Sequence, residues 1–207
     1  KTGCSKGVGG SMHLIDLNKN FIGSTAIVSG SIPVGVGFAY SLLLKDSKNR
    51  VCIFIGDSSV EEGVFFESLN FSVLKNLPVI FFCENNKYSV YSNIEKRQPK
   101  NRKISEMVKS FGIKSFSLST ANPVKFLKDL KKTLKNNLKK PIFIEVETYR
   151  FVEHCGPNND DNLAYRPKKE IDYWLKNDPL KKLTKYALKK KYLSRSSLNE
   201  LKKKIEN

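Results

Sequence analysis

Two short apolar runs, each followed at once by polar residues, constrain this chain more than any other feature. Residues 51–55 read Val-Cys-Ile-Phe-Ile, and residues 79–83 read Val-Ile-Phe-Phe-Cys. Between them, Val60, Phe65 and Leu69 fall on one side of a helical pattern. Continuous apolar runs are typical of buried parallel strands, and a helix must connect such a pair. We therefore predict a β-α-β unit whose two strands end side by side, where open α/β sheets bind their ligands.

Polar residues with suitable chemistry stand at both predicted strand ends. Asp57 follows the first run, and Asn86 follows the second run 29 positions later (86 − 57). Mg²⁺ prefers oxygen ligands and commonly keeps waters and phosphate oxygens in its shell. Gly56, Ser58 and Ser59 are small enough for backbone N–H groups to approach a diphosphate at the start of the helix. Either strand end alone fits an ordinary turn, whereas the two together favour a site for magnesium and a diphosphate.

These strand ends resemble the thiamine-diphosphate motif, in which Gly-Asp-Gly at one strand end is followed by Asn-Asn at the next. More narrowly, the chain resembles the α subunit of the dehydrogenase component of 2-oxo acid dehydrogenase complexes. That family includes the pyruvate, branched-chain 2-oxo acid and acetoin enzymes. The likeness extends from Gly3 to about Leu180, and its further matching segments are residues 6–13, 27–37, 84–88 and 148–150.

The resemblance implies an α/β thiamine-diphosphate-binding fold, with a parallel sheet flanked by helices on both faces and C-terminal helices. Residues 1–166 would form the thiamine-diphosphate domain and residues 167–207 its C-terminal helical extension. With 207 residues, 40% of them hydrophobic, the chain can bury one core, so one domain is expected. The pattern predicts the remaining elements as follows: a short strand before the turn at 29–33, helices at 33–44, 104–111 and 123–138, strands at 113–118 and 141–147, and a mobile loop at 93–103.

The resemblance also implies roles for individual residues. Asp57, Asn86 and the backbone carbonyl of Tyr88 would hold Mg²⁺, beside the diphosphate bound at residues 56–59. Ile32 would force thiamine diphosphate into its bent shape.

Two more roles follow from the resemblance. The backbone at Ser29 would contact the aminopyrimidine ring. His154, four residues beyond Arg150 at a predicted strand end, would contact the diphosphate and assist acyl transfer. Taken alone, such a histidine is usually a surface or satisfied core residue, and only its register with the family histidine favours function.

The chain departs from the family pattern at several positions. Ser58 replaces the last glycine of Gly-Asp-Gly, which is tolerable unless the position needs a positive φ. Cys155 replaces a serine that is phosphorylated in mitochondrial relatives, so that regulation is not expected. Glu61 and Glu62 would favour a helix N-terminus through the macrodipole. The glutamate that activates the cofactor belongs to the β subunit in this family.

The implied reaction is decarboxylation of a 2-oxo acid and transfer of the acyl group to a lipoyl carrier. The implied partners are a β subunit, in an α2β2 assembly, and a lipoyl-bearing acyltransferase. An acyloin-forming or acyloin-cleaving thiamine enzyme and a non-catalytic scaffold are the alternatives. Family members carry further residues before the position of Lys1, so we expect either a fragment or a second polypeptide that supplies that part.

The formal net charge of +17 comes from scattered lysines, not from a basic patch interleaved with aromatics. This pattern does not favour nucleic-acid binding, and attraction to an acidic partner protein is a better use of the charge. No apolar run approaches the roughly 18 residues that a membrane span needs, and no signal peptide is evident. We therefore expect a cytoplasmic protein without membrane contact, in which Cys52 and Cys83 are inert core residues.

Overall fold

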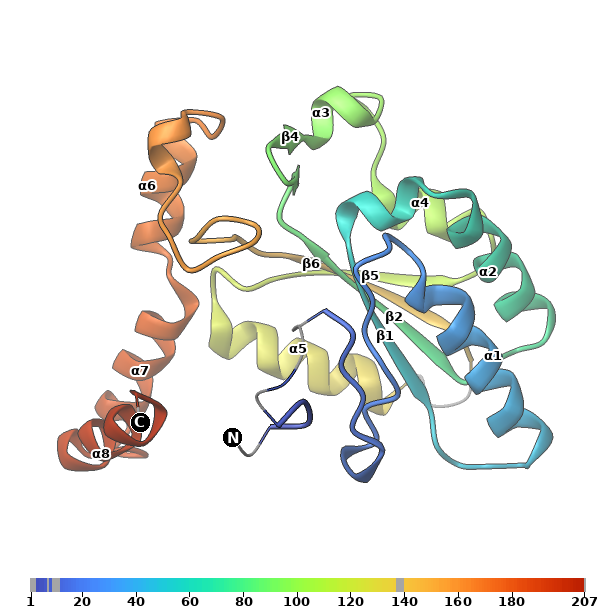
Figure 1. Cartoon of the computed structure of the whole chain (residues 1–207), viewed down its shortest axis with the longest axis horizontal. Helices are drawn as coiled ribbons and strands as arrows, with labels where there is room; N and C mark the ends of the chain where they lie inside the picture. Colours follow the sequence, from blue (N-terminus) through green and yellow to red (C-terminus); the bar gives the residue numbers. More distant parts are fainter. Residues whose placement is uncertain (1–2, 7, 9–11, 137–139, 207) are drawn as a thin grey trace.

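A parallel sheet of four strands forms the centre of the molecule. The computed structural model describes residues 3–6, 8, 12–136 and 140–206. The strand order is β1-β2-β6-β5, and all three pairings are parallel (Figure 1). The strands are β1 (Val51–Gly56), β2 (Val79–Asn85), β5 (Lys114–Ser119) and β6 (Ile142–Glu147). The predicted β-α-β unit and the α/β class are confirmed.

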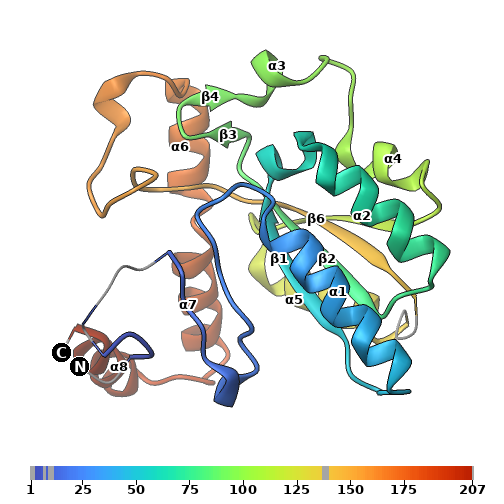
Figure 2. The same ribbon diagram turned by 45° about the vertical axis from the view of Figure 1, so that its right-hand side comes forward.

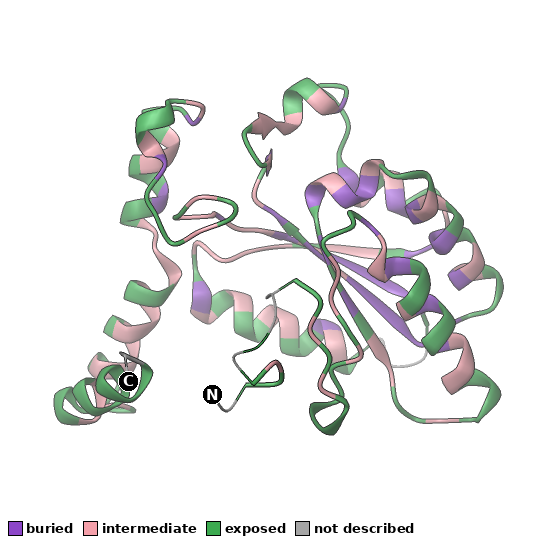
Figure 3. Ribbon diagram, in the orientation of Figure 1, coloured by how far each residue is buried: buried purple, intermediate pink, exposed green. Residues whose placement is uncertain are grey.

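Helices cover both faces of the sheet, as predicted. One face carries α1 (Ser31–Leu44), α2 (Gly63–Leu74) and α4 (Ile104–Lys109), and the other carries α5 (Pro123–Lys135) (Figure 1). Side chains alternate across β2 because successive residues of a strand point to opposite faces. Phe81 belongs to the core cluster under α1, α2 and α4, whereas Ile80 belongs to the cluster under α5. The buried residues accordingly concentrate in the strands and in the helix faces turned toward them (Figure 3).

Close packing holds α1 against β1. A Cβ at Gly35 would lie 2.6 Å from Cδ1 and from Cγ1 of Ile53, whereas a Cβ at Gly37 would meet nothing within 4 Å. A glycine inside a helix lowers its stability unless close packing requires it, and at Gly35 the close contact with the Ile53 side chain of β1 is that requirement. Behind this contact, Phe65 is fully buried, with its ring centroid 6.3 Å from that of Phe81.

The edge position of β1 corrects one prediction. Cys52 and Phe54 point to the face opposite α1 and are exposed, Phe54 to 61%. The prediction that Cys52 lies in the core is therefore wrong, because β1 is the edge strand and no helix among the described residues covers this side of it. Cys83, on the central strand β2, is buried as predicted.

Several predicted boundaries also differ. The short strand expected before residue 29 is absent from that described stretch, where the hydroxyl of Ser24 instead bonds the backbone of Leu14 and Met12. Among the described residues of this region, an isolated antiparallel bridge pairs Asp16 with Phe21. The helix predicted to reach 138 is described as far as Lys135, and residues 137–139 lie outside the described part, as do residues 7 and 9–11 of the glycine-rich segment.

The segment predicted as a mobile loop has regular structure in its first half. A hairpin of β3 (Tyr88–Ser89) and β4 (Ser92–Asn93) leads into the short helix α3 (Ile94–Arg97). The side chain of Asn93 caps that helix by accepting a hydrogen bond from the Glu95 N–H, and Gln98 is buried. The prediction of a loop over residues 93–103 is wrong at Ile94–Arg97, where a helix capped by Asn93 forms despite the low apolar content, and the mobility of the segment stays a prediction.

The C-terminal helices stand beside the sheet (Figure 1, Figure 2). They are α6 (Lys168–Lys176), α7 (Pro179–Lys189) and α8 (Arg195–Glu206), and the remaining 3-10 turns are η1 (Leu17–Lys19), η2 (Asp57–Glu61) and η3 (Asp161–Leu163). Lys182 of α7 donates to the carbonyl of Ala121, in the turn before α5, at 2.8 Å. Among the described residues, no helix has the length and apolar character to cross a membrane.

Candidate functional site

The site lies at the carboxyl ends of β1 and β2. Gly56 of β1 pairs with Glu84 of β2. Asp57 is one residue beyond this pair on its strand, and Asn86 is two residues beyond it on the other. Asp57 begins the 3-10 turn η2, which leads into α2. The two strand ends therefore lie side by side, as predicted, because the carboxyl ends of neighbouring parallel strands lie on the same side of a sheet.

Asp57 is a buried carboxylate with a cation against it. The residue is 1% exposed, and burial raises the pKa of its carboxyl, although hydrogen bonding and charge from Arg97 act in the opposite direction. Nη2 of Arg97 lies 2.5 Å from Oδ2 of Asp57, and Nη1 lies 2.5 Å from Oε1 of Glu61. Gln98 also donates to Glu61 Oε1, at 2.8 Å. The strand end therefore holds two carboxylates bridged by one guanidinium.

Sequence reasoning missed Arg97 and assigned Glu61 a different role. Arg97 is 40 positions from Asp57, and no motif connects them. Glu61 was predicted to act on the helix dipole from the first turn, but it lies in η2, before α2 begins at Gly63. Its side chain instead contacts Arg97. The one sequence signal was the closeness of Asp57 and Glu61 in the chain, because two neighbouring carboxylates favour a cation beside them.

The turn after β2 is held by its own side chains. Oδ1 of Asn86 accepts a hydrogen bond from the Tyr88 N–H at 2.9 Å, and Oδ1 of Asn85 accepts from the Lys87 N–H at 3.0 Å. The hydroxyl of Tyr88 donates to Glu170 of α6 at 2.8 Å. Burial is the main cause that raises the pKa of Tyr88 to about 12, and the hydrogen bond to Glu170 acts in the same direction. The turn thus presents Asn86 and the backbone of Tyr88 in a defined arrangement.

The small residues around η2 are joined to the start of α1. The Ser29 hydroxyl donates to the carbonyl of Ser59 at 2.8 Å, in a buried bond that spans 30 positions. Ser29 has a φ of 63°, whereas Ser58 is not among the residues with positive φ, so serine is unstrained in place of the family glycine. A Cβ at Gly56 would meet nothing within 4 Å, so its backbone is open to approach.

Ile32 follows Ser29 at the start of α1. It is fully buried, in the core cluster that also contains Val60 of η2. The structure thus brings Ser29 and Ser59 into contact and places Ile32 in the core behind them.

His154 lies on the exposed loop after β6. Its Nδ1 is 3.4 Å from Nη1 of Arg150. Nη2 of the same arginine donates to the carbonyl of Val90 at 2.8 Å, in the turn of the β3–β4 hairpin. Arg150 therefore links the histidine loop to the segment that contains Tyr88.

A buried ion pair supports this loop. Arg166 is bonded to the carboxylate of Asp160, and both side chains are almost fully buried, at 2% and 3% exposed. Its guanidinium carbon lies 5.2 Å from the ring centroid of Tyr149 and 4.8 Å from that of Tyr165. Nη1 of Arg166 also donates to the carbonyl of Arg150 at 2.5 Å. These contacts fix the start of the His154 loop relative to the sheet.

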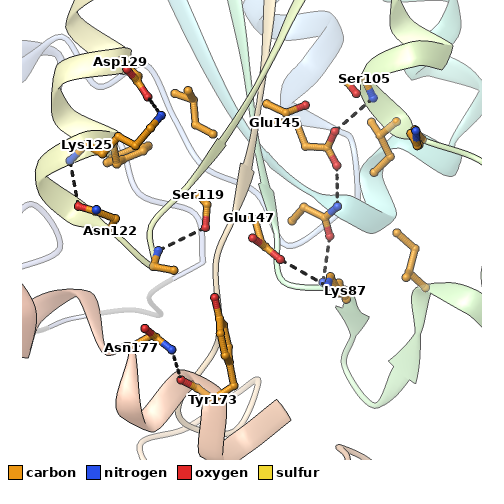
Figure 4. Close-up of a pocket in the computed structure, with 18 of the residues that line it drawn as sticks. Lys87, Ser105, Ser119, Asn122, Lys125, Asp129, Glu145, Glu147, Tyr173 and Asn177 are labelled. Atoms are coloured by element: carbon orange, nitrogen blue, oxygen red, sulfur yellow. Dashed lines mark hydrogen bonds and ion pairs between the residues drawn. The ribbon is translucent and has the colours of Figure 1, made fainter. Parts of the chain in front are cut away.

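A pocket of about 850 Å³ opens beside the site, at the ends of β2, β6 and β5 (Figure 4). Glu145, one of its lining residues, accepts hydrogen bonds from the Asn85 side chain at 2.8 Å and from the Ser105 N–H at 3.2 Å. Lys87 and Glu147 form an ion pair across it at 3.5 Å. None of the predicted site residues lines this pocket.

Within the described part of the chain, no three His, Cys, Asp or Glu side chains gather where they could hold a metal ion. A metal at this edge would need amide or backbone oxygens beside Asp57, which is the donor set that the sequence predicted. The predicted roles of Ser29, Ile32, the residues 56–59, Asn86, Tyr88 and His154 stay predictions.

Comparison with known proteins identifies relatives over the whole length of the chain. A family model described as "Dehydrogenase E1 component" matches residues 1–207. The chain is 33% identical to the pyruvate dehydrogenase E1 component subunit alpha of Rickettsia bellii (strain RML369-C), over 99% of this chain and 62% of that protein. It is 31% identical to the subunit alpha of Porphyra purpurea, over 100% of this chain and 61% of that protein.

A mitochondrial relative, the pyruvate dehydrogenase E1 component subunit alpha-2 of Arabidopsis thaliana, is 32% identical over 99% of this chain and 51% of its own length. The chain thus spans less than two thirds of the length of these curated relatives. The family match covers every element of the fold and both strand ends of the site. The chain belongs to the dehydrogenase E1 component family.

Proposed function

We propose that this chain is the magnesium- and diphosphate-binding part of an α subunit in a thiamine-diphosphate-dependent 2-oxo acid dehydrogenase. The reaction would decarboxylate a 2-oxo acid and transfer the acyl group to a lipoyl carrier. The observation that carries the proposal is the buried carboxylate of Asp57, which has a cation 2.5 Å from Oδ2 at the ends of two parallel strands. A buried carboxylate needs such a counter-charge, and in the loaded protein Mg²⁺ would supply it.

The residues present fit magnesium and a diphosphate. Asp57 supplies an anionic oxygen, while the Asn86 side chain and the Tyr88 carbonyl supply neutral oxygens on a turn held by its own hydrogen bonds. The open backbone at Gly56, just before η2, leaves room for phosphate oxygens to approach the N–H groups there. When bound, thiamine diphosphate would act as the electron sink for loss of carbon dioxide, and the protein would position it.

Other residues would set the geometry around the cofactor. Ile32 would support the bent shape, with the Ser29–Ser59 bond fixing α1 against the diphosphate turn. His154 would donate a hydrogen bond to the diphosphate and assist acyl transfer, oriented by Arg150 at 3.4 Å. Orientation of this kind favours reaction because the groups need not be ordered at the moment of transfer.

The relatives favour pyruvate as the substrate, since those compared here are named as pyruvate dehydrogenase subunits. The proposed partners are a β subunit that carries the activating glutamate, in an α2β2 assembly, and a lipoyl-bearing acyltransferase. The α chain alone would be inactive. The basic charge would serve contact with an acidic partner protein, and we propose a cytoplasmic location.

Calorimetry tests the proposal most directly. Thiamine diphosphate would be titrated into the natural-length protein, co-purified with its β subunit, with and without Mg²⁺. We expect binding that requires Mg²⁺ and that Asp57→Asn abolishes or weakens by at least about 100-fold, because the variant loses the anionic ligand. Asp172→Asn, the same charge change on the exposed surface of α6, is the control and should bind normally. Absence of magnesium-dependent binding in the unmodified complex would refute the proposal.

A further inference from the structure

Arg97 occupies the position at which the proposed metal ligand Asp57 would need to be free. Its guanidinium bridges Asp57 and Glu61, with 2.5 Å to each carboxylate. The Asp57 side chain is 2% exposed and the Arg97 side chain 12% exposed, so water screens this cluster poorly. We call these three residues the Asp57–Arg97–Glu61 cluster.

The cluster also ties a separate segment to the site. Arg97 ends α3, and Gln98 follows it with a hydrogen bond to Glu61. Within the described part of the chain, Arg97 and Gln98 make the ion pairs and side-chain hydrogen bonds that join the segment 88–103 to η2. The guanidinium that covers Asp57 is therefore one of the contacts that hold α3 (Figure 2, above the sheet), together with Gln98 and the packing of Ile94 on the core.

A guanidinium and Mg²⁺ cannot both sit favourably on this carboxylate. Like charges a few ångströms apart repel strongly where the surroundings are poorly screened. Mg²⁺ also requires close, near-octahedral contact with its oxygen ligands, which a second cation on the same group would hinder. Glu61 offers Arg97 an alternative partner, so the arginine has a place to remain once Asp57 is released.

We propose that Arg97 is a built-in competitor of the metal: its guanidinium closes the Asp57 site in the free protein, and metal loading breaks its bond to Asp57 and so loosens α3 on η2. This inference rests on the proposed function, because it takes Asp57 as a magnesium ligand. Coupling of this kind is reciprocal, so whatever holds α3 down weakens metal binding, and bound metal weakens the attachment of α3. The fraction of molecules with Asp57 free sets the apparent affinity.

The test uses the natural-length α chain co-purified with its β subunit, as the unmodified protein, as Arg97→Gln and as Lys96→Gln. Lys96 is the exposed neighbour of Arg97 on α3, so its variant loses the same charge without opening the cluster. Mg²⁺ would be titrated calorimetrically at saturating thiamine diphosphate. We expect Arg97→Gln to bind Mg²⁺ about 5- to 30-fold more tightly, the range that corresponds to a modest closing equilibrium. Lys96→Gln should differ from the unmodified protein by less than about twofold.

Limited trypsin digestion gives a readout independent of activity. Cleavage after Lys100 and Lys103, sites present in all three proteins, would be followed by mass spectrometry with and without Mg²⁺ and thiamine diphosphate. In the unmodified protein we expect loading to accelerate cleavage by at least about threefold, as α3 loosens. In Arg97→Gln the rate should already be high before loading and should change little.

Each outcome decides a separate question. Equal Mg²⁺ affinity in Arg97→Gln and the unmodified protein would overturn the competitor role and leave the proposed function intact. Weaker binding in Arg97→Gln would also overturn it, since the arginine would then contribute to the loaded site. Loading that protects the segment from trypsin would overturn the loosening of α3. Absence of magnesium-dependent binding in all three proteins would reject the proposed function, and the competitor role with it.

Discussion

Gly35 and Gly37 lie two residues apart on α1 and should respond to alanine in opposite directions. A Cβ at Gly35 would lie 2.6 Å from two carbon atoms of Ile53, a residue that is itself only 4% exposed. A Cβ at Gly37 would meet nothing within 4 Å. Both positions belong to the same helix, so the change in helix propensity is shared. The two variants therefore separate the packing contact from the backbone effect.

The magnitudes follow from these distances. Alanine in place of glycine inside a helix stabilises by roughly 0.5–1 kcal/mol. Forcing an extra carbon into a packed core costs about 1–3 kcal/mol. Gly37→Ala should therefore raise the free energy of unfolding by about 0.5–1 kcal/mol, and Gly35→Ala should lower it by up to about 2 kcal/mol. Their difference, about 1–3 kcal/mol, measures the contact with Ile53 alone.

Urea unfolding followed by far-ultraviolet circular dichroism would measure both free energies. Thermal unfolding should show the same order, with about 2–4 °C for each kcal/mol in a chain of this size. Ile53→Val shortens the contacting side chain, so combined with Gly35→Ala it should recover part of the loss. Equal shifts for the two alanine variants, or a stabilising Gly35→Ala, would refute the claim that close approach of β1 requires glycine at this position.

Two further predictions concern buried charge and buried thiols. Arg166→Met would leave the Asp160 carboxylate buried without its main partner, and should lower the free energy of unfolding by about 3–5 kcal/mol in urea titrations; a loss below about 1 kcal/mol would show that the pair is not buried in solution. Burial raises the pKa of Cys83 well above its usual value, and desolvation raises the pKa of the Cys52 thiol to about 11 even though the residue is partly accessible. Because the thiolate is the reactive form, alkylation at pH 8 should modify the exposed Cys4 and Cys155 before Cys52, with a rate for Cys52 that keeps rising toward pH 11. Cys83 should react only after unfolding, and its early labelling in mass spectra would contradict the assignment.

Much of the fold could be predicted because its signals are local. Each apolar run gives a strand regardless of what surrounds it, and parallel strands joined by a helix must end at one edge of the sheet. That rule alone brought Asp57 and Asn86 together in the prediction, and the register of β1 and β2 confirms it. Serine at position 58 was flagged as a departure, and the backbone there shows why it is tolerated.

The errors concern features that depend on the path of the whole chain. Whether Cys52 is buried depends on strand order, which made β1 an edge, and an apolar run does not reveal that order. The segment around Arg97 was predicted to be a mobile loop because its composition is polar. The Asn93 cap and the carboxylates of Glu61 and Asp57, 36 and 40 positions before Arg97, hold it in place. Composition reports solvation, whereas such contacts are set by tertiary structure.

By itself, the sequence determined the β-α-β unit, the polar strand ends and the family to which the chain belongs, because these depend on residues that are close in sequence or on ordered motifs. Only the tertiary structure decided what stands against Asp57. A buried carboxylate requires a counter-charge, but many lysines and arginines of this basic chain were available to supply it. The turn after β2 and the capped α3 carry Arg97 to that place, and chain geometry, not residue type, made the choice.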